Sequence, residues 1–169
     1  MKDTINFYRQ ENSYGEFSNF YYAPITIAGQ EWPTTEHYFQ AQKFAHLDDK
    51  QYVELVRLAK TPSVAAKLGR NRSFPLRPDW EEVKDDVMRD CVLQKFLQHP
   101  DLAKVLLGTG ERYLNEHTRN DRYWADGGDG RGKNMLGIVL METRTKMAAM
   151  TPEQIEEEVA KARSQGAVV

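Results

Sequence analysis

A helical segment enclosed by two prolines is the strongest constraint on how this chain can fold. Pro78 and Pro100 bracket the segment, and a helix interior excludes proline because its ring clashes with the preceding turn. The apolar residues that recur at helical spacing between the prolines are Trp80, Val83, Val87, Cys91 and Leu97. Asp79 can cap the helix, with Glu82 three residues later as in a capping box. The sequence therefore predicts one helix from Asp79 to about Gln98.

Shorter elements are expected on both sides of this helix. Strands are predicted at residues 5–8, 25–27, 31–32 and 113–118, with a turn at Gly29 between the second and third. Helices are predicted at residues 35–45, 49–59, 62–68 and 101–107, with Gly69 as the C-cap of the third, and another from Asn134. The predicted fold class is α+β, with one helix-rich domain at residues 1–150 and a small N-terminal β-sheet. A charged, solvated tail helix is expected within residues 151–169.

Composition and charge exclude several classes of protein. With 23 Lys and Arg against 25 Asp and Glu, the net charge of −2 lacks the basic excess typical of duplex-DNA binders. Cys91 is the only cysteine, which excludes a disulfide framework and a cysteine-based zinc site and leaves core filler as its interpretation. The histidines lack metal-ligand spacing, so we predict no catalytic metal and no cofactor. No apolar run suits a membrane span or signal peptide, so a cytoplasmic protein without a membrane partner is expected.

The segment WPTTEHYFQAQKF, residues 32–44, places three different polar groups on one strip of a helix. At 100° per residue, Glu36, Gln40 and Lys43 fall within about 60° of arc, with Phe39 and Phe44 on the flanks. One interpretation is that Glu36 only favours the helix N-terminus and pairs with Lys43 or solvent. The other is that the aromatic flanks enclose the strip, and an enclosed carboxyl can be tuned for acid and base work.

A second group of residues could bind a base and a phosphate. Trp80 at the start of the long helix follows three arginines in the sequence, Arg70, Arg72 and Arg77. An aromatic plane beside guanidinium groups is suited to a nucleobase and a phosphate. The alternative is that Trp80 fills the core as a staple and that the arginines are ordinary surface residues.

The glycine-rich segment at residues 121–134 is a third candidate. Gly127, Gly132 and Lys133 have the spacing of a phosphate-binding P-loop, but Asn134 stands where Ser or Thr should bind magnesium. The preceding residues are also polar and aromatic, unlike the strand that feeds a P-loop, and an EF-hand lacks its closing glutamate. The amides of the segment could still cradle a phosphate or ribose oxygen. A tight structural turn is the alternative.

Three stretches together resemble the signature blocks of the NADAR family of YbiA-like proteins: EFSNF at residues 16–20, WPTTEHYFQAQKF at residues 32–44, and residues 121–137. A linking segment, with matches at residues 69–80, 84, 87–88 and 95–96, follows the family in the same order. The resemblance extends from Ile5 to about Met147. Thr35 and Ala125 depart from it, because serine and glycine are expected at these two positions. The first exchange keeps the hydroxyl, and the second could restrict the loop.

The resemblance implies cleavage of an N-glycosidic bond at ribose C1. Family members hydrolyse ribosylamino-pyrimidine phosphates from early riboflavin biosynthesis, and others remove ADP-ribose from guanine in nucleic acid. The expected partner is thus a small ribose phosphate or ADP-ribose, or an ADP-ribosylated nucleic acid. The implied catalytic residues are Glu36, Asp121 and Lys43. The implied substrate-binding residues are Asn19, Arg70, Trp80, Trp124, Gly128, Gly132 and Asn134.

Two mechanisms and two rival functions remain open at this point. In one mechanism Asp121 stabilises the oxocarbenium-like ribose, Glu36 activates water or shuttles the proton, and Trp80 stacks on the base. In the other, the amine of Lys43 traps the opened sugar as a Schiff base. A non-catalytic ADP-ribose-binding module would not need Glu36. A P-loop hydrolase would need magnesium and a hydroxyl at position 134.

Overall fold

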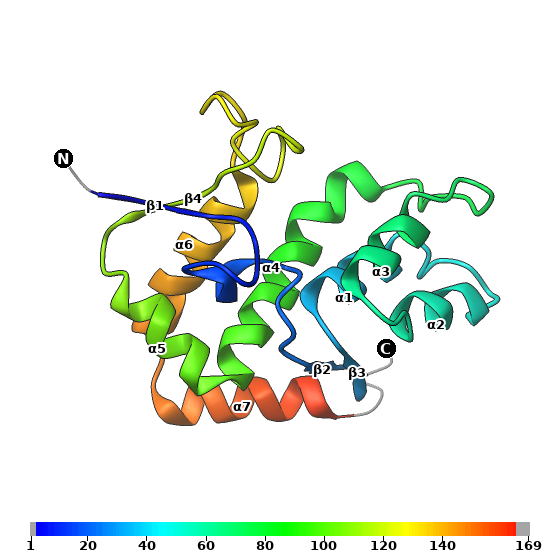
Figure 1. Cartoon of the computed structure of the whole chain (residues 1–169). Coiled ribbons are helices and arrows are strands. Elements are labelled where there is room, and N and C mark those ends of the chain that lie inside the picture. The colour runs from blue at the N-terminus through cyan, green and yellow to red at the C-terminus, as the bar shows by residue number, and fades with distance from the viewer. Residues whose placement is uncertain (1–2, 165–169) are drawn as a thin grey trace.

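The computed structural model describes residues 3–164 and has the predicted α+β architecture (Figure 1). Its strands are β1 (Thr4–Phe7), β2 (Ile25–Ile27), β3 (Gln30–Trp32) and β4 (Tyr113–Glu116). Its helices are α1 (Thr35–Gln42), α2 (Gln51–Arg57), α3 (Pro62–Gly69), α4 (Trp80–Gln98), α5 (Pro100–Gly108), α6 (Met135–Ala148) and α7 (Pro152–Arg163), with a short 3-10 helix at Gly15–Phe17. No helix in residues 3–164 is long and apolar enough to cross a bilayer.

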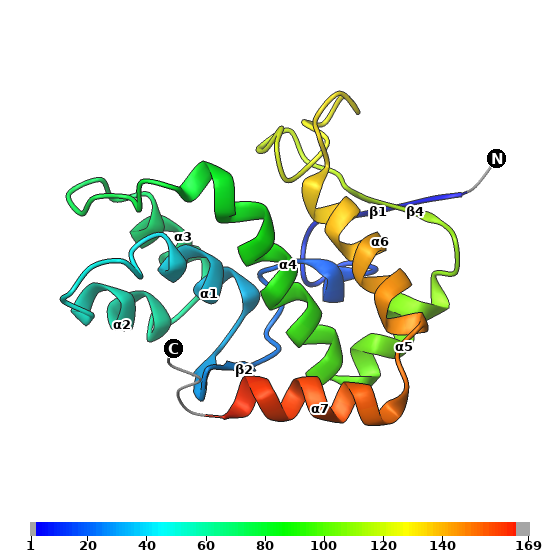
Figure 2. The same ribbon diagram turned by 180° about the vertical axis from the view of Figure 1, so that it is seen from behind.

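Helix α4 runs through the middle of the molecule, with α1 packed against one side of it and α6 against the other (Figures 1 and 2). Helices α1, α2 and α3 form one half, while β1, β4 and α6 form the other. The residues of α4 that fill the core include Met88, Cys91, Val92, Phe96 and Leu97. Burying these side chains drives the packing of both halves onto one helix. Cys91 is a fully buried free thiol, in agreement with its interpretation as core filler.

The strand pairing differs from a single small N-terminal sheet. Strands β2 and β3 form the expected antiparallel hairpin, with Ala28 and Gly29 at positive φ in its turn. Strand β1 instead pairs in parallel with β4, so that Phe7 lies opposite Glu116. Parallel pairing needs a long crossover connection, and here most of the chain supplies it. The structure therefore has two two-stranded sheets among its described residues.

Two predicted helix caps differ from the structure: the first is in the right position without its capping bond, and the second is wrong. Asp79 occupies the N-cap of α4, but its carboxylate binds the guanidinium of Arg77, with Arg77 Nε 2.7 Å from Asp79 Oδ1, and makes no capping bond. Gly69 is the last residue of α3, and Arg70 takes the C-cap position in a right-handed conformation. Gly69 is needed for a different reason, because a Cβ at this position would lie 1.9 Å from Gln40 Oε1. The glycine thus lets α3 approach the polar strip of α1 closely.

Helix α7 begins where the tail helix was expected. Thr151 caps it by accepting a hydrogen bond from Gln154 N, and the Gln154 side chain accepts from Thr151 N in return. The helix lies along one edge of the molecule, below α5 and α4, and reaches the β2–β3 hairpin, where Gly29 N donates to Ala162 O (Figures 1 and 2). The rest of the predicted tail, residues 165–169, lies outside the described residues.

Candidate active site

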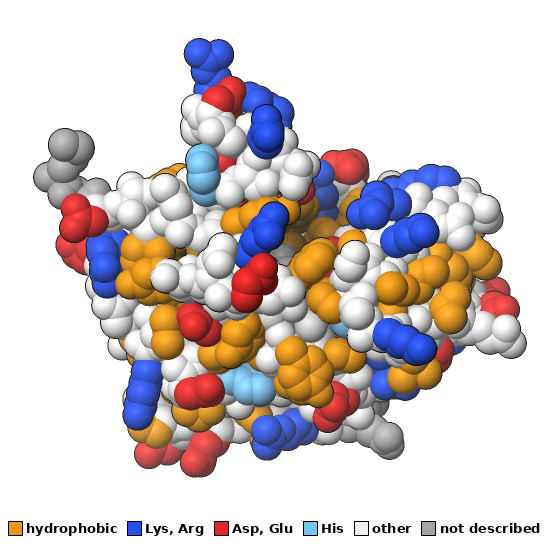
Figure 3. Space-filling model, in the orientation of Figure 1, with side chains coloured by type: hydrophobic (Ala, Val, Ile, Leu, Met, Phe, Trp, Pro, Cys, Tyr) orange, Lys and Arg blue, Asp and Glu red, His pale blue; other side chains and the backbone are white. Residues whose placement is uncertain are grey.

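A cavity of about 640 Å³ lies where the two halves of the molecule meet over α4. Helices α1 and α3 line one side, the N-terminal segment and the end of β4 with its following loop line the other, and Met88 of α4 contributes between them. Figure 3 shows Lys and Arg side chains on the loop at the top and on the lobe at the right, to either side of the hollow between them. Six of the predicted site residues line the cavity: Asn19, Glu36, Lys43, Arg70, Asp121 and Trp124.

Hydrogen bonds hold the start of α1, and Glu36 lies in its first turn. The Thr34 hydroxyl accepts a hydrogen bond from His37 N at 3.2 Å and lies 2.7 Å from His37 Nδ1. His37 Nε2 lies 3.0 Å from the Ala59 carbonyl, so it donates there and Nδ1 accepts from Thr34. Burial lowers the pKa of His37, which keeps the ring neutral in this arrangement.

Glu36 is a buried carboxyl with one strong hydrogen-bond donor. Its side chain lies in the cavity wall, 9% exposed, and Gln40 Nε2 donates to its Oε1 at 2.7 Å. Burial raises the pKa of Glu36, and this effect exceeds the opposing influence of Gln40 and of the positive charge on Lys43. Such a carboxyl can exchange a proton closer to neutral pH than an exposed glutamate does.

Lys43 faces the same cavity from the end of α1 and is also buried. Burial is the main cause that lowers its pKa to about 8, and the positive charge of Arg72 adds to it. Its ammonium lies 5.8 Å from the centroid of the Phe39 ring and 5.9 Å from that of Trp80. Among the described residues it forms no salt bridge with Glu36, so the simple pairing of the two is not found. The amine is therefore available at moderately alkaline pH.

Asn19 reaches the cavity from the segment after the 3-10 helix. Thr35 Oγ1 donates to Asn19 Oδ1 at 2.8 Å, and Glu36 N donates to Asn19 O at 3.3 Å. These bonds occupy the oxygens of Asn19 and leave its amide nitrogen, 3.5 Å from Met88 Sδ, as a donor for a ligand. Thr35 thus provides the hydroxyl that serine would provide. Behind this segment, the buried Lys95 donates to Ser18 O at 2.9 Å.

Asp121 lies across the cavity from α1 and has two functions. Its Oδ1 accepts hydrogen bonds from Tyr123 N and Trp124 N, both at 2.8 Å, which closes a turn. Its Oδ2 receives no hydrogen bond from residues 3–164 and is free for a ligand. Trp124, placed by this turn, packs edge-to-face on Phe39 with ring centroids 5.2 Å apart. One oxygen therefore shapes the loop while the carboxylate charge stays in the cavity.

Trp80 is not among the residues that line the cavity. It is 5% exposed and packs at a tilt on Phe39, with ring centroids 5.1 Å apart. Phe39 and Lys43 lie between Trp80 and the ligand space, so the structure places Trp80 behind the wall, as the staple alternative described. Its support of Phe39 and Lys43 is structural.

Trp80→Ala is accordingly expected to lower the free energy of unfolding by about 3–5 kcal/mol, because it leaves a large void beside Phe39. Urea unfolding of the variant measures this, and Trp80→Phe, which fills most of the space, is the matched control with a smaller loss. A stable Trp80→Ala protein whose substrate affinity alone falls would show instead that the indole stacks on the base.

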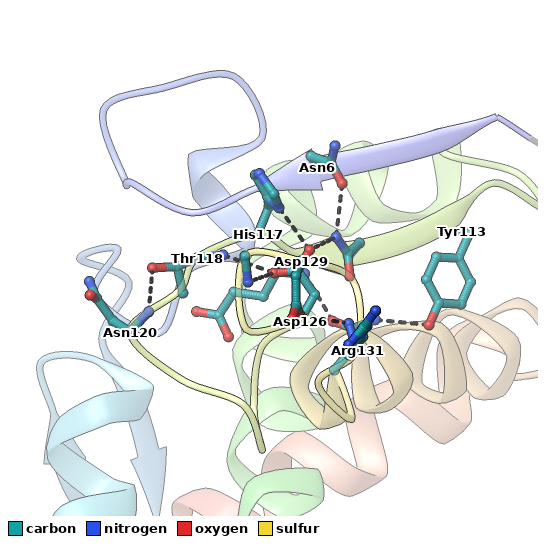
Figure 4. Close-up of polar contacts among 12 residues, drawn as sticks. Asn6, Tyr113, His117, Thr118, Asn120, Asp126, Asp129 and Arg131 are labelled. Atoms are coloured by element: carbon teal, nitrogen blue, oxygen red, sulfur yellow. Dashed lines mark hydrogen bonds and ion pairs between the residues drawn. The ribbon is translucent and has the colours of Figure 1, made fainter.

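The glycine-rich loop is held by internal hydrogen bonds, and its glycines do not line the cavity. The carboxylate of Asp126 accepts from Asn115 Nδ2 at 2.9 Å, His117 Nδ1 at 2.7 Å, Thr118 N at 3.1 Å and Gly128 N at 2.8 Å (Figure 4). These donors lower the pKa of Asp126 to about 2 against the opposing effect of burial. The loop amides that donate to protein carbonyls are those of Gly127, Gly132, Lys133 and Asn134.

Gly128, Gly132 and Asn134 therefore have structural roles and lie outside the cavity wall. Gly128 has a φ of 83°, and a Cβ on Gly132 would lie 2.4 Å from the Ala125 carbonyl. Asn134 is 2% exposed, and its side chain makes two hydrogen bonds to the backbone of β4. It accepts from Glu116 N and donates to Leu114 O, each at 2.9 Å. Ala125 is fully buried without a positive φ, so it does not strain the loop.

Glu116 is a cavity residue that the sequence did not indicate. It is the last residue of β4, half-buried in the wall, and its pKa is raised to about 8 by burial and by the negative charges of Asp121 and Glu36. The weak alternation of polar and apolar residues in this strand hid which side chains face inward. Besides Glu11 of the N-terminal segment, the cavity is thus lined by three acidic residues, from α1, from β4 and from the loop after β4.

Comparison with known proteins assigns this fold and cavity to a family. The family model described as NADAR domain matches residues 6–148, which is most of the chain. The chain belongs to the NADAR family. The resemblance noted in the sequence is confirmed, and the matched range contains Glu36, Glu116 and Asp121.

The relatives within the NADAR family include named enzymes. The N-glycosidase YbiA of Escherichia coli is 54% identical over 88% of this chain and 91% of its own length. An N-glycosidase of Nostoc punctiforme is 44% identical over 85% of this chain and 92% of its own. A riboflavin biosynthesis protein of Vibrio vulnificus is 42% identical over 90% of this chain but only 41% of its own. The expectation of an N-glycosidase, a hydrolase of N-glycosyl bonds, is confirmed.

A solved structure in the same family supports the fold. The NMR structure of Escherichia coli YbiA matches 88% of this chain and 86% of its own, with a TM-score of 0.80 and 52% sequence identity. The α+β fold class predicted from the sequence is therefore confirmed.

Proposed function

We propose that this NADAR protein hydrolyses the bond between ribose C1 and nitrogen in ribosylamino-pyrimidine phosphates or in ADP-ribosylated guanine. The observation that carries the proposal is the cavity that brings Glu36 and Asp121 to opposite walls, with the side-chain amide of Asn19 in the same lining. Breaking this bond builds positive charge on the sugar and negative charge on the departing nitrogen, so carboxyl groups must flank it. The volume of about 640 Å³ suits a small phosphorylated substrate.

The proposed mechanism divides the work between the two walls. The carboxylate of Asp121, oriented by Tyr123 N and Trp124 N, stabilises the oxocarbenium-like ribose. Glu36 activates the water that attacks C1, because its carboxylate is held by Gln40 and its raised pKa suits it to accept a proton. Asn19 and Arg70 bind the hydroxyl and phosphate oxygens of the sugar.

A second mechanism gives Lys43 a covalent role. Its lowered pKa, about 8, leaves a substantial neutral fraction of the amine near physiological pH. A neutral amine can attack C1 of the opened sugar and form a Schiff base with it. Reduction with borohydride during turnover separates the two mechanisms. A stable adduct on Lys43, absent in Lys43→Arg, supports the covalent route, and unmodified protein supports direct attack by water.

The names of relatives bear on the substrate class, and the cysteine content bears on the cellular location of the protein. Relatives named as riboflavin biosynthesis proteins occur in Vibrio vulnificus and Zea mays, which favours the ribosylamino-pyrimidine phosphates. ADP-ribosylated guanine, free or in a nucleic acid, shares the ribosyl C1–N bond. We place the protein in the cytoplasm as part of the same proposal, because its one cysteine is a buried free thiol.

The proposed activity is tested by assaying both substrate classes in parallel in excess chelator. Residues 3–164 contain no group of three His, Cys, Asp or Glu side chains placed to hold a metal ion, so hydrolysis is expected to continue. Release of free base and ribose phosphate is the measurement. Binding without turnover would instead support a non-catalytic ADP-ribose-binding module. Loss of turnover on chelation, restored by one divalent ion, would contradict metal independence.

A further inference from the structure

The position of Glu116 is fixed by hydrogen bonds of its backbone. Its amide donates to Asn134 Oδ1 at 2.9 Å, and its carbonyl accepts from Asp126 N at 2.9 Å. The two residues that follow it in the chain, His117 and Thr118, are both bound by the Asp126 carboxylate (Figure 4). The direction of the Glu116 side chain into the cavity is thus set by the β1–β4 pairing, the glycine-rich loop and α6 together.

The carboxyl of Glu116 has no hydrogen-bond partner among residues 3–164, although it lies in the cavity wall. Such a group is neutral more readily than one that receives hydrogen bonds, because donors stabilise the charged form. The negative charges that raise its pKa further are those of Asp121, Glu36 and Asp126. The other ionisable side chains that face the cavity are Lys43 and Arg70 from the α1–α3 side and Tyr8, Arg9 and Glu11 from the N-terminal segment.

Glu36 and Glu116 differ in whether a hydrogen-bond donor stabilises their carboxylates, and this difference suits them to different roles. Gln40 donates to Glu36 at 2.7 Å and favours its carboxylate, whereas no donor favours the carboxylate of Glu116. Of the two, Glu36 is therefore better suited to receive a proton from water. Glu116 is better suited to hold a proton and release it, and the raised pKa, about 8, is consistent with a carboxyl that is protonated at neutral pH.

We propose that Glu116 is the general acid of this site and gives its proton to the nitrogen that leaves ribose C1. The assignment rests on the proposed function. As the C1–N bond breaks, its electron pair stays on nitrogen, which takes the proton of Glu116. Water bonds to C1 and loses a proton to Glu36. Solvent then returns that proton to Glu116, so that one substrate and one water give one amine and one ribose phosphate.

The proposal is tested with two ribose 5-phosphates whose leaving groups differ in how much they need a proton. One is the ribosylamino-pyrimidine phosphate, whose amine must be protonated, and the other is 4-nitrophenyl β-ribofuranoside 5-phosphate, whose phenolate leaves without one. For Glu116→Gln we expect kcat to fall at least about a hundredfold on the first and less than about fivefold on the second. The pH profile gives a second test. Wild-type turnover of the ribosylamino-pyrimidine phosphate is expected to fall as pH rises through about 8, and turnover by the variant is expected to show no such fall. Glu153→Gln, on the exposed start of α7, is the remote control with the same change of charge.

Equal losses on both substrates would overturn the proposal and leave Glu116 as a structural residue. Wild-type protein that cleaves neither of these substrates nor ADP-ribosylated guanine would refute the proposed function itself. In that case the carboxyl-carbon NMR signal of Glu116, assigned by its loss in Glu116→Gln, still tests the assignment in the free protein. The expected titration midpoint is about 8. A midpoint near the ordinary value for glutamate, about 4.3, would rule out the acid role whatever the substrate.

Discussion

Glu36→Gln is expected to lower turnover at least about a hundredfold while the melting temperature and the substrate affinity change little. Glutamine has nearly the same volume and helix propensity, and its amide can still pair with Gln40 in the cavity wall. What it lacks is a group that exchanges a proton near neutral pH. Steady-state kinetics on the preferred substrate, together with thermal unfolding, measure the two expectations separately.

The effect on stability has a defined sign. The pKa of Glu36 is raised in the folded state, so its contribution to stability is complete below the unfolded value and is lost as pH rises through the folded one. Glutamine stays neutral and does not suffer that loss. The variant is therefore expected to be at least as stable as the wild type at neutral pH, which a urea titration measures.

The matched control for Glu36→Gln is Glu82→Gln, in the exposed first turn of α4. Both changes remove one negative charge near a helix N-terminus, which is worth at most about 1 kcal/mol of stability. If the two variants have the same near-normal turnover, Glu36 has no part in the chemistry. The search for the base would then move to Lys43 and Asp121.

Asp121→Asn should give the second large effect, a loss of turnover of at least about a hundredfold in a correctly folded protein. The asparagine oxygen can accept the same two hydrogen bonds from Tyr123 N and Trp124 N, so the turn is kept. The negative charge that faces the ribose is lost. Because that charge acts on the transition state more than on the bound substrate, kcat should fall more than KM rises.

Asp121→Ala separates the charge from the shape of the loop. It removes the acceptor of both amides as well as the charge, so the position of Trp124 on Phe39 should change along with activity. Near-ultraviolet circular dichroism reports that ring environment. If Asp121→Asn retained turnover and only Asp121→Ala lost it, Asp121 would be a loop-shaping residue and not a stabiliser of the ribose cation.

The sequence alone determined the features that depend on local periodicity. The long helix between Pro78 and Pro100, the hairpin around Gly29 and the strip of Glu36, Gln40 and Lys43 all follow from residues close together in the chain. Asp79 takes the predicted N-cap position, but the neighbouring Arg77 occupies its carboxylate, so it makes no capping bond. The C-cap predicted at Gly69 was wrong, since the tertiary contact with Gln40 is what requires its small size.

Only the tertiary structure decided what faces the cavity across from α1. Strands β1 and β4 pair although Asn6 and Asn115 are 109 positions apart, and this pairing brings Glu116 to the wall. The same packing turns Trp80 behind Phe39 and uses the side chain of Asn134 to join α6 to β4. Local sequence patterns specify which face of each helix or strand is polar and which is apolar. Burial of apolar surface over the whole chain selects which of these faces pack together. That selection makes three carboxyls from distant segments into one site.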